Sequence, residues 1–303
     1  MKFSSYFFLT AILLIIGFGS CGRSSGSLQG ANSSLVDPEL KKDLFVWVEN
    51  ARVRKEPDLK ADVIAEIKGG EKLSLTGEVS NSKIKVNLRG VDFEDVWAKV
   101  KTSEGKEGWI FKGMLTEDEY KAKAMNDFLI VPGERVGQIK LLSSQEDAEK
   151  IFGKEFVTEG DIYISEGITK KGFYLFKNSP LELQCPLDDN KKIFGIYVRQ
   201  PGGNWATKEG VKMGTSLDEL AKLNEKPIKF NGFGWDFGGL VYDFNNGKLE
   251  SYYSALSIVL GEPDSVEELN EYMGDVECST ADKKILGKGV KVAELAVFGA
   301  PSL

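Results

Sequence analysis

The stretch VWAKV at residues 96–100 decides the fold of the first half of the chain, together with GWI at residues 108–110. The two segments flank a turn at Gly105. Upstream, ARVRKEP at residues 51–57 alternates apolar and polar residues and ends at a proline, and a Gly-Gly turn at 69–70 follows the next apolar run. Short strands at close spacing, separated by glycine turns, predict a small all-β barrel over residues 44–116.

This pattern resembles the bacterial SH3 family, whose repeats combine a V-R-x-x-P strand, a Gly-Glu turn, W-x-K-V and a final G-x-x-G-W. The matching residues are Val53, Arg54, Pro57, Gly70, Glu71, Trp97, Lys99, Val100, Gly105, Gly108 and Trp109. The resemblance implies a non-catalytic module that binds cell-wall peptide or another protein. One departure is the long segment 81–95, where Ile84, Val86 and Leu88 alternate with polar residues, a pattern that favours the extension of a hairpin.

The aromatic residues of this module are the first candidates for a binding groove, because aromatic faces bury much area. They are Trp47, Trp97 and Trp109, and the alternative for each is a place in the barrel core. Arg54 is a further candidate, since an arginine on a strand can pair with a carboxylate of a wall peptide. Its alternative is a solvated position on the strand face.

The N-terminus has the features of an export signal. Lys2 precedes an apolar run at residues 6–18, which is too short for a comfortable membrane span and ends in Gly19-Ser20-Cys21. Small residues followed directly by cysteine resemble the lipobox of bacterial lipoproteins, although Phe18 stands where that family usually has leucine. The resemblance implies a signal peptide over 1–20 and lipid, such as palmitate, on Cys21. The alternative is a secreted protein that is cleaved nearby.

The segment after Cys21 is rich in glycine and serine, which is typical of a flexible tether. We therefore expect residues 21–43 to hold a folded domain off a membrane of the cell envelope, with the lipid as the membrane contact. The membrane is the outer membrane or the periplasmic face of the inner membrane.

The second half of the chain alternates strand and helix patterns. A linker helix is predicted over 117–126, and an α+β domain with a mostly antiparallel sheet over 127–303. Two segments about 73 residues apart have the same pattern, a predicted strand followed by a Ser-x-x-Glu cap, and form an internal repeat. The caps are Ser143 with Glu146 and Ser216 with Glu219. A third cap pattern begins at Ser265.

The G-x-x-x-G-x-S-x-x-E-L step at residues 210–220 resembles the repeat unit of β-lactamase-inhibitor-like folds and of small outer-membrane assembly lipoproteins. This resemblance implies an inhibitor or assembly factor that acts through the second domain. Nearby, GFGWDFGG at residues 232–239 alternates glycine and aromatic residues. Trp235 in this stretch is a candidate contact for a sugar or a partner, and the alternative is a bulged strand.

Export places the chain in an oxidising compartment, where disulfides form. With Cys21 used for lipid, the two remaining cysteines allow one intramolecular bridge, so a Cys185–Cys278 disulfide is predicted. The alternative is two buried free thiols.

The amino-acid composition excludes several classes of catalytic chemistry and disfavours one class of partner. The chain has no histidine, which excludes Ser-His-Asp and Cys-His catalysis and His-ligated zinc. Its net charge of −7 disfavours nucleic acid as a partner. A paired-carboxylate glycosidase stays open as a less favoured alternative, with Asp236, Asp243 and Asp275 as candidates. We expect a non-enzymatic lipoprotein with no cofactor and no metal site, whose partner is peptidoglycan or an envelope protein.

Overall fold

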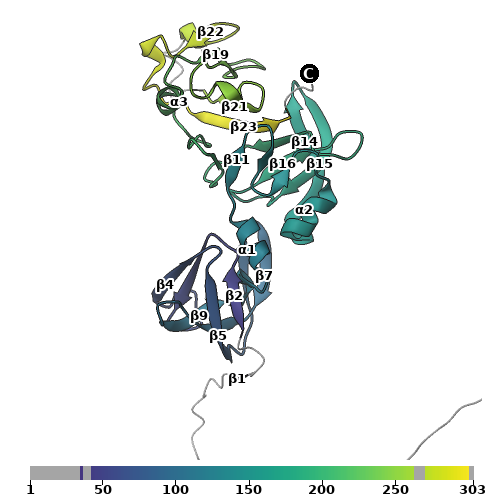
Figure 1. Cartoon of the computed structure of the whole chain (residues 1–303), viewed down its shortest axis with the longest axis vertical. Helices are drawn as coiled ribbons and strands as arrows, with labels where there is room; N and C mark the ends of the chain where they lie inside the picture. Colours follow the sequence, from purple (N-terminus) through teal and green to yellow (C-terminus); the bar gives the residue numbers. More distant parts are fainter. Residues whose placement is uncertain (1–34, 37–41, 263–269, 300–303) are drawn as a thin grey trace, which may run out of the picture. The chain divides into compact units, whose positions relative to one another are not determined.

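The computed structural model describes residues 35–36, 42–262 and 270–299, and from residue 34 onward the chain forms one compact unit. The described residues form five β-sheets, almost entirely antiparallel, and only three α-helices (Figure 1). No helix among these residues is long and apolar enough to cross a membrane. The predicted signal peptide and the lipidated Cys21 lie outside the described residues.

The first part of the unit is an all-β module, as predicted. Its sheet has the strand order β10-β2-β5-β8-β9-β3-β4, with β1 paired to β5. The strands are β1 (Leu35–Val36), β2 (Asp43–Val46), β3 (Asn50–Arg54), β4 (Val63–Lys68), β5 (Lys72–Val79), β8 (Trp97–Lys101), β9 (Glu107–Phe111) and β10 (Leu115–Thr116).

Strand β3 shows how the sequence produces this module. Ala51 and Val53 are fully buried, whereas Asn50 and Arg52 are exposed, because successive side chains of a strand point to opposite faces. The next strand in the sheet, β9, approaches β3 closely. A Cβ on Gly108 would lie 2.6 Å from the carbonyl oxygen of Arg54, so only glycine fits there. This contact explains the glycine that precedes Trp109 in the motif.

The segment expected to extend a hairpin forms a separate hairpin of its own. Strands β6 (Ile84–Leu88) and β7 (Val91–Asp95) pair in a two-stranded antiparallel sheet. The turn between them is Arg89-Gly90, with φ of 53° and 85°, and positive φ at both central residues matches the twist of a two-residue hairpin. The hairpin therefore presents Arg89 at its tip.

The predicted linker helix forms as α1 (Glu119–Met125), two residues later than expected. Its N-cap is Asp118, whose carboxylate accepts the N–H of Lys121, and not Thr116. Ala122, Ala124 and Met125 are buried, so one face of α1 packs into the core. A 3-10 helix (Lys112–Met114) connects β9 to β10.

The remainder of the unit is strand-rich with two short helices, α2 (Gln145–Phe152) and α3 (Leu217–Asn224). A six-stranded antiparallel sheet has the order β14 (Val157–Ser165), β15 (Ile168–Leu175), β16 (Leu183–Pro186), β17 (Gly195–Val198), β23 (Val292–Phe298) and β21 (Leu256–Leu260). A four-stranded sheet has the order β13 (Ile139–Lys140), β12 (Arg135–Val136), β11 (Leu129–Val131) and β18 (Ala206–Thr207). A three-stranded sheet has the order β20 (Val241–Asp243), β19 (Lys229–Asn231) and β22 (Glu277–Ser279).

The helix caps follow the predicted chemistry with one shift. Ser216 and Glu219 form a capping box at the start of α3, as predicted. At α2 the box is made by Ser144 and Asp147, and the predicted pair of Ser143 and Glu146 is wrong by one residue. Aspartate at the third helical position satisfies the same backbone N–H. The third cap pattern, at Ser265, lies outside the described residues.

The predicted disulfide does not form in the structure, which has Cys185 and Cys278 as buried free thiols. Cys185 lies in β16 of the six-stranded sheet and pairs with Phe173 of β15. Cys278 lies in β22 of the three-stranded sheet and pairs with Phe230 of β19. Each cysteine is therefore fixed in its own sheet, and the alternative of two small apolar side chains holds.

The burial of these thiols predicts their reactivity. Burial raises the pKa of Cys185, and it raises the pKa of Cys278 to about 11, so both are protonated at pH 8. Because the thiolate is the nucleophile, iodoacetamide at pH 8 is expected to label neither cysteine in the folded protein and both after unfolding in guanidinium. Mass spectrometry of non-reduced peptides checks this, and a linked Cys185–Cys278 peptide would contradict it.

Candidate functional site

The SH3-like module carries a surface pocket of about 450 Å³, here called the Trp97 pocket. It is lined by Asn50, Arg52, Arg54, Leu59, Glu66, Trp97, Phe111 and Met114. Asn50, Arg52 and Arg54 are alternate residues of β3 and therefore share one face of the strand. Two candidates from the sequence, Arg54 and Trp97, thus meet at one site.

The two arginines of the Trp97 pocket are held differently. The Nη1 of Arg54 donates to the carbonyl oxygen of Ala61 at 2.6 Å and ties β3 to the loop that contains Leu59. Arg52 lies opposite Glu66 of β4, and its Nε is 3.5 Å from the Glu66 carboxylate. Both of these side chains are more than 60% exposed, so water weakens this ion pair.

The floor of the Trp97 pocket is apolar. Trp97 is only 3% exposed and packs edge-to-face against Phe111, with ring centroids 6.5 Å apart. The buried indole N–H of Trp97 has no hydrogen-bond partner among the described residues. Trp97 is therefore a core residue whose side chain also lines the floor of the pocket, and its role in binding stays a prediction.

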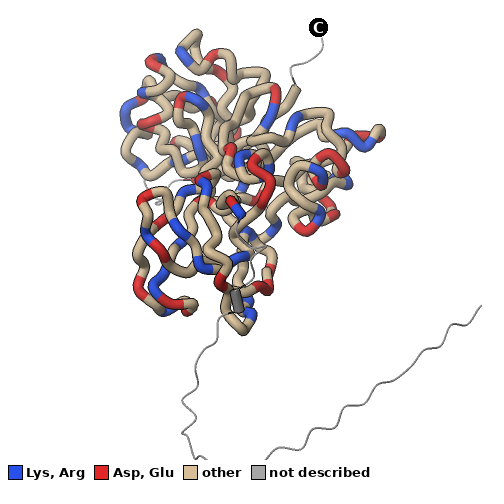
Figure 2. Tube along the Cα trace, turned by 60° about the horizontal axis from the view of Figure 1, so that its bottom comes forward, with Lys and Arg blue, Asp and Glu red and all other residues tan. Residues whose placement is uncertain are grey.

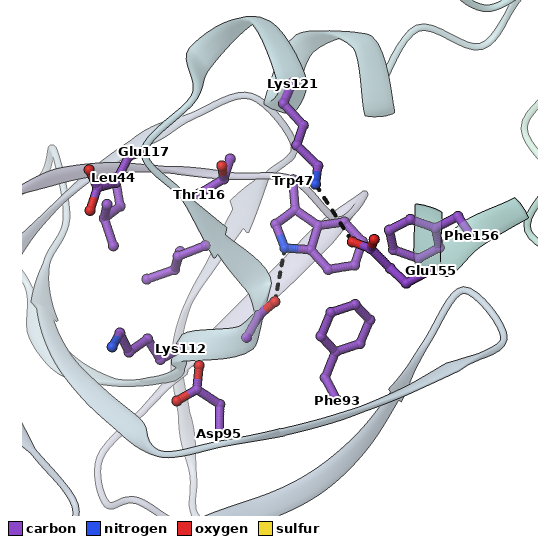
Figure 3. Close-up of a pocket in the computed structure, with 12 residues that line it drawn as sticks. Leu44, Trp47, Phe93, Asp95, Lys112, Thr116, Glu117, Lys121, Glu155 and Phe156 are labelled. Atoms are coloured by element: carbon purple, nitrogen blue, oxygen red, sulfur yellow. Dashed lines mark hydrogen bonds and ion pairs between the residues drawn. The ribbon is translucent and has the colours of Figure 1, made fainter. Parts of the chain in front are cut away.

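A second pocket, of about 310 Å³, forms around Trp47 and is here called the Trp47 pocket (Figure 3). The indole N–H of Trp47 donates to the carbonyl oxygen of Gly113 at 2.9 Å. Phe93 of β7 and Phe156 contact the indole, each with its ring centroid 5.5 Å from that of Trp47. Trp47 is only 5% exposed, so it belongs to the buried core of the unit as well as to the lining of this pocket.

Both acidic and basic side chains surround the Trp47 pocket. Lys121 of α1 lies 3.7 Å from the Glu155 carboxylate, and Asp95, Lys112 and Glu117 complete the rim (Figure 3). Figure 2 shows the same interspersion of acidic and basic residues over the described trace. The Trp47 pocket is lined by two lysines and three carboxylates, so it lacks the excess of positive charge found among the residues that line the Trp97 pocket.

Arg89 is the residue that the sequence reasoning missed. Its side chain is 3% exposed, its Nη1 donates to the carbonyl oxygen of Met125 at 2.8 Å, and its Nη2 lies 3.4 Å from Glu49. The guanidinium stacks over Phe176 at 5.2 Å and over Trp47 at 5.6 Å. Burial lowers the pKa of Arg89, and the nearby Glu49 opposes that shift. The only signal in the sequence was an arginine beside a glycine in the predicted hairpin.

The remaining candidates do not join either pocket. Trp109 of β9 is partly buried, pairs with Lys99 and Arg54 in the sheet and packs on the core. Trp235 lies in the segment between β19 and β20, is 37% exposed and donates its indole N–H to Gly232 at 2.8 Å. Its ring meets that of Phe237, which is 42% exposed. Trp235 and Phe237 form an exposed aromatic pair.

The three carboxylates suggested for a glycosidase are not gathered around either pocket. Asp236 and Asp275 are exposed, and Asp243 accepts the backbone N–H of Asn245 at 2.6 Å. None of them lines the Trp97 pocket or the Trp47 pocket. Among the residues that the structure describes, no group of three or more Cys, Asp or Glu could hold a metal ion.

Comparison with known proteins agrees with the all-β module. The sequence profile of the bacterial SH3 domain matches residues 49–116, which span β3 to β10 and include every residue that lines the Trp97 pocket. A search of curated proteins finds no match. With its motif residues, its antiparallel barrel strands and this match, the segment 49–116 is a bacterial SH3 domain.

Proposed function

We propose that this chain is a non-enzymatic, membrane-anchored lipoprotein whose SH3 domain binds a cell-wall peptide or a protein partner at the Trp97 pocket. The observation that carries the proposal is the pocket itself, which joins an apolar floor to two arginines on one face of β3. Such a combination of an apolar wall with a few polar groups is typical of a binding site. The lack of histidine in the whole sequence supports a binding role over the common hydrolase chemistries.

The membrane anchor in this proposal rests on the sequence around Cys21. The apolar run, the small residues before the cysteine and the Gly/Ser-rich tether together support lipidation. We expect the full chain expressed in a bacterial host to enter the detergent phase of a Triton X-114 partition, and Cys21→Ala to enter the aqueous phase. A Cys21→Ala protein that stays with the detergent would contradict lipidation at this residue.

Wall binding is tested with residues 22–303, which retain the whole compact unit, by co-sedimentation with purified peptidoglycan. Leu59 is 54% exposed at the rim of the Trp97 pocket, so Leu59→Ala removes apolar contact area without disturbing the core. Leu59→Ala is expected to remove about 1 kcal/mol of the free energy of apolar burial, which weakens binding about fivefold.

The matched control is Leu142→Ala, because Leu142 is 69% exposed and lies outside the SH3 domain. The control is expected to sediment with the wall as the unaltered protein does. If neither the unaltered protein nor the control sediments, wall peptide is not the ligand. Equal loss in both variants would place binding elsewhere than at the Trp97 pocket.

The exposed aromatic pair favours a second candidate, an inhibitor or assembly factor that acts through residues 127–303. The side chains of Trp235 and Phe237 are partly exposed to solvent, and aromatic residues are enriched at protein interfaces. If this candidate is correct, Trp235→Ala abolishes binding to an envelope protein while co-sedimentation with peptidoglycan is absent from the start. The two candidates therefore predict opposite outcomes for the wall experiment.

A further inference from the structure

We propose that the Trp97 pocket recognises the free terminal carboxylate of a peptide. This inference rests on the proposed peptide-binding function and specifies which group of the ligand the pocket binds. The pocket has two arginines and a single carboxylate among its lining residues, in a chain with a net charge of −7. A local excess of positive charge on an acidic protein selects an anionic group on the ligand.

The geometry of the two arginines suits a carboxylate. Arg52 and Arg54 are two residues apart on β3, so their guanidinium groups project from the same side of the sheet. The Nη1 and Nη2 atoms of Arg52 have no hydrogen-bond partner among the described residues, because its one ion pair uses Nε. A planar guanidinium with free donors binds a carboxylate through two parallel hydrogen bonds.

The Glu66 carboxylate lies beside Arg52, where we propose that the ligand carboxylate binds. Its carboxylate lies 3.5 Å from Arg52 Nε, and both side chains are well exposed, so the pair is weak and readily exchanged. A peptide carboxylate competes with Glu66 for the same arginine. Removing the charge of Glu66 therefore strengthens binding, whereas removing the charge of Arg52 weakens it.

The rest of the pocket distinguishes a peptide from a bare anion. Leu59, which is 54% exposed, and Met114 offer apolar surface to the side chains that precede the carboxylate. Asn50 supplies an amide that both donates and accepts, which fits a peptide group. The volume of about 450 Å³ accommodates the last residues of a chain.

The experiment is a calorimetric titration of residues 22–303 with N-acetyl-trialanine, with its C-terminal amide and with inorganic phosphate. The free carboxylate is expected to bind at least tenfold more tightly than the amide, and phosphate is expected to compete weakly. Arg52→Gln is expected to lower the affinity for the carboxylate about tenfold, and Glu66→Gln to raise it about threefold. Lys101→Gln is the matched control, because Lys101 is an exposed strand cation of the same domain that does not line the pocket.

Equal affinity for the acid and the amide, or an Arg52→Gln variant that binds as the unaltered protein does, would overturn the inference. Phosphate that competes as well as the peptide would also overturn it, because the pocket would then read charge alone. Co-sedimentation of the same protein with peptidoglycan separates the two claims. Wall binding without carboxylate dependence refutes only the inference, and carboxylate binding without wall binding refutes the wall as the ligand while the inference stands.

Discussion

Gly90→Ala is expected to destabilise the protein by roughly 3 kcal/mol or more, through strain and a steric clash together. Gly90 has a φ of 85°, a conformation that costs an alanine about 1–2 kcal/mol. A Cβ at this position would also overlap the backbone carbonyl oxygen of Lys177, which follows β15. The tip of the β6–β7 hairpin would then have to move away from its neighbours, and Arg89 would move with it. Chemical denaturation of residues 22–303 measures the change in the free energy of unfolding.

Gly105→Ala is the matched control for this prediction. Gly105 has nearly the same φ, 82°, in another turn of the SH3 domain, but no atom lies within 4 Å of a Cβ built there. The control variant is expected to lose only the conformational term, about 1–2 kcal/mol. If the two variants lose the same stability, the close approach between residue 90 and Lys177 does not exist in solution.

Phe156→Ala is the second substitution with a large expected effect, a loss of about 3–5 kcal/mol. Phe156 is 2% exposed and contacts three rings, those of Trp47, Phe93 and Phe176, at centroid distances of 5.5, 5.9 and 5.3 Å. Its removal leaves a cavity in the cluster that also supports the Arg89 guanidinium. Thermal unfolding followed by circular dichroism measures the loss as a lower Tm.

Phe237→Ala is the control, since Phe237 is 42% exposed and its one ring contact within the described part of the chain is with Trp235. It is expected to change the stability by less than about 0.5 kcal/mol, as for other surface positions. A Phe156→Ala variant that is as stable as Phe237→Ala would mean that the aromatic cluster is not packed in solution.

The strands of the SH3 domain could be predicted because their signal is local. Alternation in β3, the W-x-K-V run of β8 and the glycines before Trp109 each constrain the chain within a few residues. The same holds for the β6–β7 hairpin and for the capping box of α3. The cap of α2 was displaced by one residue because two serines stand side by side there, and Asp147 replaces the glutamate that the pattern requires.

The site could be predicted only in part, because its walls depend on contacts between distant segments. Trp47 is buried by Phe156, more than one hundred positions later, and no periodicity around Trp47 reports this. Arg89 was missed for the same reason, since its partners are Glu49, Met125 and Phe176. The disulfide was predicted wrongly because the number of cysteines says nothing about which sheet each one enters.

The proposed function places the ligand, a cell-wall peptide or a protein partner, at the Trp97 pocket of the SH3 domain. Hydrogen–deuterium exchange of residues 22–303, with and without soluble peptidoglycan fragments, tests it most directly. If the ligand binds there, slower exchange is expected in residues 50–68 and 97–114, which contain the residues that line the pocket. Slower exchange confined to residues 127–299, above all to residues 232–239 around the exposed aromatic pair, would contradict it.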